Sequence, residues 1–254
     1  MTRKAKAIIL HASGSNRNHE ALWACERAGA QGEALHMSAL TQAKVLDAQM
    51  LVLAGGFSYG DALGAGRRWA FELELGFKEQ LEAFIASGKP VIGICNGFQV
   101  LLKGGYLDLR NEQATLSHNL HPSGEARFEC RWVYLQPNPL SNSPFIRSLT
   151  EGIYCPVAHG EGRFLARGRI PRGQIAFQYA DAQGAICGNY PCNPNGSLES
   201  IAGVTNAQGN VLGLMPHPED HILDIQHPRW QRNESGHSGL ALLQSAIAYA
   251  KAFF

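Results

Sequence analysis

The chain has 254 residues and is 45% hydrophobic, which is enough to bury the core of one large α/β domain. Its 22 basic and 21 acidic side chains nearly cancel, and no dense run of Lys or Arg is present, so we expect neither a nucleic acid nor a membrane surface as partner. The apolar run near the N-terminus is too short for a signal sequence and breaks at His11. We therefore expect a cytoplasmic protein.

Apolar strands alternate with amphipathic helices through the first hundred residues, a pattern typical of a mostly parallel sheet with helices on both faces. Strands are expected over residues 5–10, 34–36, 50–53 and 91–94. One helix is expected from Asn18 to Ala28, and the spacing of Leu73, Phe77, Leu81 and Phe84 predicts a longer one that ends near Gly88.

Between about residues 111 and 190 the pattern changes to short, turn-rich runs that favour antiparallel strands at one end of the main sheet. We interpret this segment as an elaboration of a single domain spanning residues 1–254, because a further apolar strand follows at 211–215. The closing segment, with Leu240, Leu243, Ile247 and Phe254 at helical spacing, predicts a last helix packed on the core.

A candidate nucleophile lies between the fourth strand and the helix after it. Gly93, Cys95 and Gly97 form a G-x-C-x-G string, so Cys95 sits at a sharp strand-to-helix turn that pushes its side chain out of the sheet. The unpaired N–H groups of a helix N-terminus favour a thiolate there. The alternative is a small buried cysteine beside glycines that only allow close helix packing.

A proton-transfer pair follows the strand at 211–215. A cysteine nucleophile needs a histidine that takes and returns protons, and the histidine needs an acid that fixes its tautomer. His217 and Glu219 supply both, and the prolines beside them, Pro216 and Pro218, favour an extended segment in which the two side chains point the same way. A lone histidine after a strand would ordinarily be a loop or core residue.

The third strand ends in a glycine-rich turn, residues 55–61, whose backbone amides can face developing negative charge. Gly56 is the expected oxyanion-hole donor, and Asn96, the residue after the nucleophile, is the expected second one. A phosphate-binding loop is disfavoured, because neither G-x-x-x-x-G-K-[ST] nor G-x-G-x-x-G occurs. All three features follow strands, so we expect them to meet at one edge of the sheet.

These three segments resemble the signature segments of class I glutamine amidotransferases. The strings at 62–66, 158–164 and 193–197 are similar to those of the glutaminases of phosphoribosylformylglycinamidine synthases, and the resemblance covers roughly residues 5 to 250. One departure is Asp220, which stands where many relatives carry arginine and puts a local salt bridge in doubt.

The resemblance implies a flavodoxin-like α/β fold and a glutaminase that forms a cysteine thioester. It implies that ammonia passes to a partner, an ATP-dependent synthetase that converts formylglycinamide ribonucleotide to its amidine in purine biosynthesis, and it allows a small accessory subunit. No cofactor or metal is expected on this chain, and ATP and Mg²⁺ belong to the synthetase. The implied substrate contacts are Gln99, His159, Gly160 and Glu161, added to the catalytic Cys95, His217 and Glu219.

The same segments are also compatible with the glutaminase of another amidotransferase, a thiol γ-glutamyl hydrolase, or a regulatory binding module on the same fold. The cysteines lack C-x-x-C spacing, so neither a disulfide framework nor a zinc site is expected, although Cys187 and Cys192 are close in sequence. The segments 193–197 and 227–230 fall outside the catalytic scheme. Either contact with a partner or ordinary exposed turn chemistry would explain Asn193 to Ser197.

Overall fold

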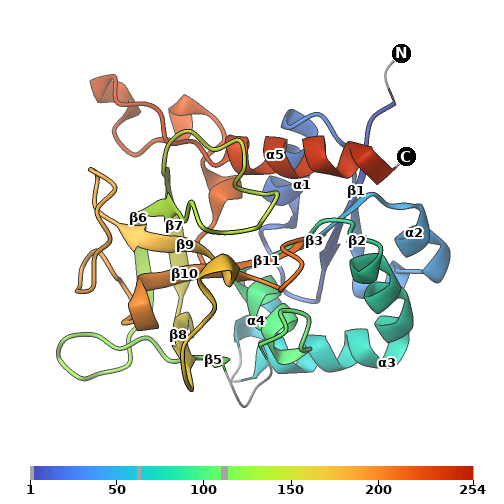
Figure 1. Cartoon of the computed structure of the whole chain (residues 1–254), viewed down its shortest axis with the longest axis horizontal. Coiled ribbons are helices and arrows are strands. Elements are labelled where there is room, and N and C mark those ends of the chain that lie inside the picture. The colour runs from blue at the N-terminus through green and yellow to red at the C-terminus, as the bar shows by residue number, and fades with distance from the viewer. Residues whose placement is uncertain (1–2, 62–63, 110–113, 254) are drawn as a thin grey trace.

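The computed structural model describes residues 3–61, 64–109 and 114–253. Within these ranges nine strands form one sheet in the order β2-β1-β3-β4-β11-β10-β9-β6-β7 (Figure 1). Their bounds are β1 Lys6–His11, β2 Gln31–His36, β3 Met50–Leu53, β4 Val91–Ile94, β6 Glu129–Pro137, β7 Ile153–His159, β9 Ile175–Ala180, β10 Ile201–Thr205 and β11 Val211–Leu214. A separate pair consists of β5 (Ala114–Ser117) and β8 (Arg163–Ala166).

The sheet is parallel in one half and antiparallel in the other. Strands β2, β1, β3, β4 and β11 run parallel, whereas β10, β9, β6 and β7 pair antiparallel. The parallel strands are short and apolar, and all four residues of each of β3, β4 and β11 are buried. Such runs fit strands that are covered on both faces. The predicted α/β fold with an antiparallel middle region is confirmed.

Helices cover both faces of the parallel half. The helices α1 (Asn18–Arg27) and α5 (Leu240–Ala250) pack together on one face, and α3 (Ala65–Ala86) and α4 (Asn96–Lys103) pack on the other (Figure 1). In α5, Leu243 and Ile247 are buried as their spacing predicts. Phe254 lies outside the described residues, as do Ala62 and Leu63 of the string at 62–66.

Several boundaries differ from the sequence predictions. The second strand begins at Gln31 rather than Ala34. The apolar pattern did not reveal its first residues, because β2 is an edge strand and these residues are exposed or only partly buried. A short helix that the sequence analysis missed, α2 (Gln42–Asp47), begins where the Thr41 hydroxyl accepts a hydrogen bond from the Lys44 N–H at 3.3 Å. In α3, Phe77 is only half-buried and lies at a kink with φ −142°.

Among the described residues, no helix combines the length and apolar character needed to cross a membrane.

Candidate active site

Three strand ends deliver the predicted catalytic segments to one edge of the sheet. Leu53 of β3 pairs with Gly93 of β4, and Ile94 of β4 pairs with Leu214 of β11, so the chains leave these parallel strands side by side. The glycine after β3 fits between the other two segments. A Cβ at Gly55 would lie 2.9 Å from both Cys95 Cβ and His217 Cε1, so a larger residue would collide with both side chains.

Cys95 occupies a strained turn between β4 and α4, with φ 51° and ψ −105°. Both glycines of the G-x-C-x-G string are required by close backbone approach. A Cβ at Gly93 would lie 2.4 Å from the Gly97 oxygen, and one at Gly97 would lie 2.1 Å from the Leu53 oxygen. A positive φ at a non-glycine residue persists only where the surrounding structure fixes it, and such positions cluster at active sites. The geometry is that of a nucleophile elbow.

His217 and Glu219 form a buried pair beside Cys95. The His217 Nδ1 lies 2.7 Å from Glu219 Oε1, and the two side chains are 3% and 0% exposed. The predicted extended segment is wrong, because Pro218–Asp220 is a 3-10 turn. The turn nevertheless brings the carboxylate onto the imidazole. Burial lowers the pKa of His217, but the Glu219 charge and the contact with Cys95 outweigh it and hold that pKa well above its usual value.

The glycine turn after β3 presents candidate oxyanion donors. Gly56 has φ +89°, a conformation that glycine adopts without strain. Within the described residues, the backbone N–H groups of Gly56 and Asn96 donate to no protein acceptor, which leaves them available to a ligand. The Asn96 side chain ties the turn to the elbow, because its Oδ1 accepts from the Ser58 N–H at 3.2 Å and its Nδ2 donates to Asp61 Oδ1 at 2.8 Å.

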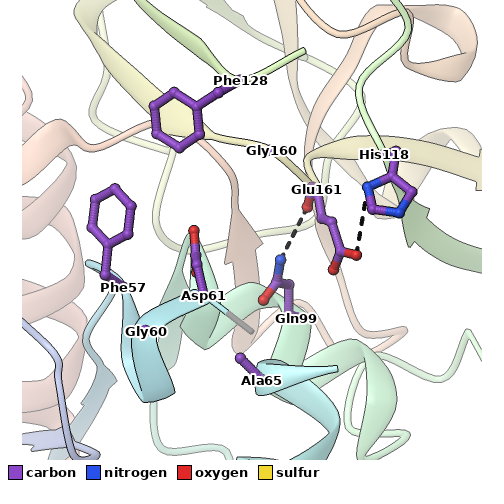
Figure 2. A pocket seen from close by; sticks show the side chains of 9 residues that line it. All are labelled: Phe57, Gly60, Asp61, Ala65, Gln99, His118, Phe128, Gly160 and Glu161. Atoms are coloured by element: carbon purple, nitrogen blue, oxygen red, sulfur yellow. Dashed lines mark hydrogen bonds and ion pairs between the residues drawn. The ribbon is translucent and has the colours of Figure 1, made fainter. Parts of the chain in front are cut away.

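A cleft opens beside this centre, and three of the predicted substrate contacts line it (Figure 2). Gln99 projects into the cleft from α4, and its Nε2 donates to the Glu161 backbone oxygen at 3.0 Å. Phe57 and Phe128 stack at 5.8 Å between ring centroids, and both are partly exposed. The complete lining is Phe57, Gly60, Asp61, Ala65, Gln99, His118, Phe128, Gly160 and Glu161. Cys95 is 2% exposed and adjoins Asn96, which bonds Asp61 on the cleft wall.

His159, the fourth predicted contact, turns its side chain into the protein rather than into the cleft. It is 1% exposed, and its Nδ1 lies 3.1 Å from the Asn119 Oδ1. Burial, with the neighbouring His217 adding to it, lowers the pKa of His159 to about 3. The ring therefore stays neutral and does not compete with His217 for protons. The neighbouring Gly160 and Glu161 line the cleft, whereas the His159 side chain does not.

Two asparagines to which the sequence analysis gave no role in the site hold the cleft wall from behind. Asn119 accepts from the Gly162 N–H at 3.0 Å and donates to the His159 oxygen at 2.7 Å. Asn195 donates to the Gly162 oxygen at 2.8 Å. Both sides of Gly162 are thus fixed by side-chain amides that lie 43 and 33 residues away. Such contacts leave no local pattern in a sequence.

The interpretation of Asn193 to Ser197 as exposed turn chemistry is wrong. Asn193, Asn195 and Ser197 are 3%, 0% and 5% exposed. The Ser197 hydroxyl accepts from the Phe164 N–H at 3.0 Å, and the Asn193 Oδ1 accepts from the Ser197 N–H at 3.1 Å. The segment supports the wall of the cleft because it must satisfy backbone groups that the turn after β7 leaves unpaired.

We expect the substitution Asn195→Ala to weaken glutamine binding more than it slows turnover. The Gly162 oxygen would lose its 2.8 Å bond from Asn195 and keep only the Ser197 hydroxyl at 3.5 Å, at a cost of about 1–3 kcal/mol, and the loosened wall would contact bound substrate in the ground state. KM for glutamine should rise on the order of tenfold while kcat changes less. Steady-state kinetics test this, with Asn189→Ala, an exposed position in the same loop, as the matched control. An unchanged KM in Asn195→Ala would remove the wall from substrate binding.

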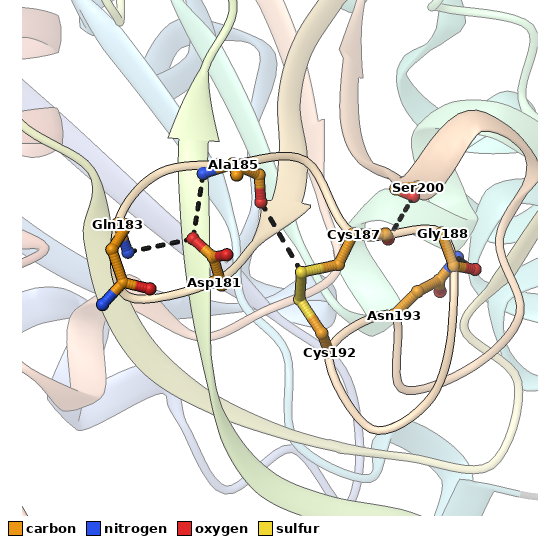
Figure 3. Close-up of a disulfide and its surroundings, with 8 residues drawn as sticks. All are labelled: Asp181, Gln183, Ala185, Cys187, Gly188, Cys192, Asn193 and Ser200. Carbon is orange, nitrogen blue, oxygen red and sulfur yellow. Dashed lines mark hydrogen bonds between the residues drawn. A yellow bond between two sulfur atoms is a disulfide. The ribbon is translucent and has the colours of Figure 1, made fainter.

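The sequence analysis expected no disulfide framework and missed the one disulfide among the described residues. Cys187 and Cys192 are bonded and close a loop that leads directly into Asn193 (Figure 3). The Asn193 Nδ2 reaches back to the Gly188 oxygen at 3.4 Å, and the Ser200 hydroxyl donates to the Cys187 oxygen at 2.5 Å. The spacing of five residues belongs to no common disulfide or metal motif, which is why the sequence did not indicate it.

The fold answers two further questions that the sequence raised, about residues 227–230 and about Asp220. His227 is 5% exposed and packs with the rings of Trp132 and Tyr154, so it is a core residue, while Trp230 remains 45% exposed. Asp220 does form a salt bridge, in which its Oδ2 lies 3.1 Å from the Arg17 Nε.

Across the described part of the chain, no group of three or more His, Cys, Asp or Glu is arranged to hold a metal ion.

Comparison with known proteins agrees with this geometry. Residues 4–250 match the family described as the CobB/CobQ-like glutamine amidotransferase domain. The chain is 42% identical to phosphoribosylformylglycinamidine synthase subunit PurQ of Treponema denticola, over 97% of this chain and 99% of that protein. It is 39% identical to the subunit of the same name from Dehalococcoides mccartyi, over 98% of each.

A solved structure is also similar. A chain in the structure of PurLQS from Thermotoga maritima superimposes with a TM-score of 0.75 at 30% identity, covering 97% of this chain and 99% of that one. The chain therefore belongs to the CobB/CobQ-like glutamine amidotransferase family, and within it to the PurQ subunits of phosphoribosylformylglycinamidine synthase.

Proposed function

We propose that this chain is the glutaminase subunit of phosphoribosylformylglycinamidine synthase. It hydrolyses L-glutamine and supplies ammonia to a separate ATP-dependent synthetase subunit, the counterpart of PurL, which converts formylglycinamide ribonucleotide to its amidine in purine biosynthesis. Similarity to PurQ subunits over nearly the whole chain carries the assignment. The substrate of the synthetase is a charged nucleotide of central metabolism, so the proposal places the subunit in the cytoplasm.

The proposed mechanism assigns one role to each buried group. The Cys95 thiolate attacks the side-chain carbonyl carbon of glutamine, and the oxyanion of the tetrahedral intermediate accepts from the N–H groups of Gly56 and Asn96. His217 gives a proton to the departing ammonia, and a γ-glutamyl thioester remains on Cys95. Water then attacks the thioester with His217 as base, which releases glutamate. Glu219 holds the imidazole and stabilises its charged form.

Reconstitution tests the function directly. The purified chain, mixed with the synthetase subunit, formylglycinamide ribonucleotide, ATP and Mg²⁺, should form the amidine with glutamine as nitrogen donor. The synthetase alone should do so only with ammonium salts. Failure of the mixture to use glutamine, with the ammonia-dependent reaction intact, would contradict the assignment and favour a different amidotransferase.

A further inference from the structure

The glycine turn that carries Gly56 rests on the loop between β1 and α1. The Asn16 N–H donates to the Gly56 oxygen at 2.9 Å, and the Tyr59 N–H donates to the Ser13 oxygen at 2.7 Å. The stem of Arg17 covers the same glycine, because a Cβ at Gly56 would lie 2.9 Å from Arg17 Cγ. The position of the candidate oxyanion donor is therefore set by residues 13–17.

Arg17 also reaches the turn that carries His217 and Glu219. Its Nε lies 3.1 Å from the Oδ2 of Asp220, the residue after Glu219, and the Asp220 N–H donates to the His217 oxygen at 3.3 Å. The Arg17 Nη1 further contacts Glu20 Oε1 at 3.4 Å. One side chain thus bridges the glycine turn, the N-terminus of α1 and the turn of His217 and Glu219.

The ion pair contributes little to folding stability. The Arg17 and Asp220 side chains are 39% and 19% exposed, and pairs in contact with solvent typically stabilise proteins by about 0–1 kcal/mol. The position of the oxyanion donor, by contrast, has a large effect on the reaction rate. An oxyanion donor must lie about 2.7–3.1 Å from the developing charge, and a misplacement of about 1 Å can cost about 10²-fold in rate. A weak pair can therefore have a large effect on turnover.

We propose that the Arg17–Asp220 ion pair positions the Gly56 turn relative to Cys95 and His217, so that both residues are positioning residues for the oxyanion step. The inference rests on the proposed glutaminase mechanism.

The test compares Arg17→Met, Asp220→Asn and the charge-exchanged double variant Arg17→Asp with Asp220→Arg, each in complex with the synthetase. In both single variants, kcat for glutamine-dependent amidine formation should fall about 10- to 100-fold, while KM for glutamine changes less than about threefold. The double variant should recover part of the loss. Ammonia-dependent synthesis should remain at the wild-type rate in all of them.

Alkylation of Cys95 by iodoacetamide distinguishes positioning of the oxyanion donor from general damage. This displacement occurs at a saturated carbon and forms no oxyanion, so its rate should stay at the wild-type value in the single variants. Arg229→Met is the matched control, because Arg229 Nε lies 3.1 Å from Glu234 Oε2 in a pair that contacts none of the catalytic residues. Its kcat should be unchanged.

Each outcome decides the proposal. Wild-type kcat in both single variants would overturn it, as would a fall in Cys95 alkylation parallel to the fall in kcat. Failure of the proposed function has a different signature, namely glutamine-dependent activity that survives the substitution Cys95→Ser.

Discussion

Replacing Cys95 by serine should abolish glutamine-dependent amidine formation, with a loss on the order of 10⁴ to 10⁶ in rate, as expected when a covalent nucleophile is removed. A serine hydroxyl in the same strained turn is a far weaker nucleophile than a thiolate. Ammonia-dependent synthesis by the partner should continue at the wild-type rate, because added ammonia bypasses the thioester.

Labelling by a diazo-ketone analogue of glutamine provides the control for this variant. The adduct should form on Cys95 and be absent from Cys95→Ser. Burial raises the pKa of Cys25 to about 12 and that of Cys155 well above its usual value, so these thiols should not react, and Cys187 and Cys192 are bonded to each other. Cys130 is exposed and offers an internal comparison. Peptide mapping that located the adduct mainly on Cys130 would remove Cys95 from the role of nucleophile.

The parallel half of the fold could be predicted because its signals are local. The apolar runs at 50–53 and 91–94 coincide with β3 and β4, and each is bounded by glycine or proline within a few residues. The first helix ends one residue before its predicted end. By contrast, α2 has six residues, too few for a period of 3.6 to stand out from its surroundings.

The convergence of the catalytic segments was also predictable, since the carboxyl ends of neighbouring parallel strands meet at one edge. Cys95 and His217 are 122 positions apart, yet they follow the neighbouring parallel strands β4 and β11, whose last residues, Ile94 and Leu214, pair with each other. What supports them was not predictable. Asn119, Asn195 and Arg17 act through bonds to backbone groups or charges 30 or more residues away, and only the folded chain brings these partners together.

The exposed-turn interpretation of residues 193–197 failed for an instructive reason. Asn, Pro and Gly are favoured in turns, and this segment is a turn, but turn residues are not always exposed. Here each polar side chain satisfies a buried backbone group, so burial costs little. Composition gives the local conformation in such a case and leaves the environment undetermined.

The second large effect should come from His217. His217→Ala should lower the glutamine-dependent rate by about 10²- to 10⁴-fold, because ammonia would leave without a general acid and the thioester would lose its general base. Glu219→Gln should retain measurable activity, since the amide can still hydrogen-bond the imidazole. Wild-type activity in His217→Ala would exclude the histidine from proton transfer.

The pH profile of kcat/KM separates the charge of Glu219 from its hydrogen bond. In the proposed mechanism the active form carries a protonated His217, so activity should be lost at alkaline pH as that proton dissociates. In the wild type the Glu219 charge holds the pKa of His217 well above its usual value despite burial. In Glu219→Gln the contact with Cys95 still offsets part of the burial but the Glu219 charge is gone, so the pKa of His217 should fall, and the alkaline limb of kcat/KM should move to lower pH. Glu234→Gln, an exposed carboxylate paired with Arg229, is the control and should leave the limb in place. An alkaline limb that stays fixed in Glu219→Gln would show that Glu219 orients the ring without setting its charge.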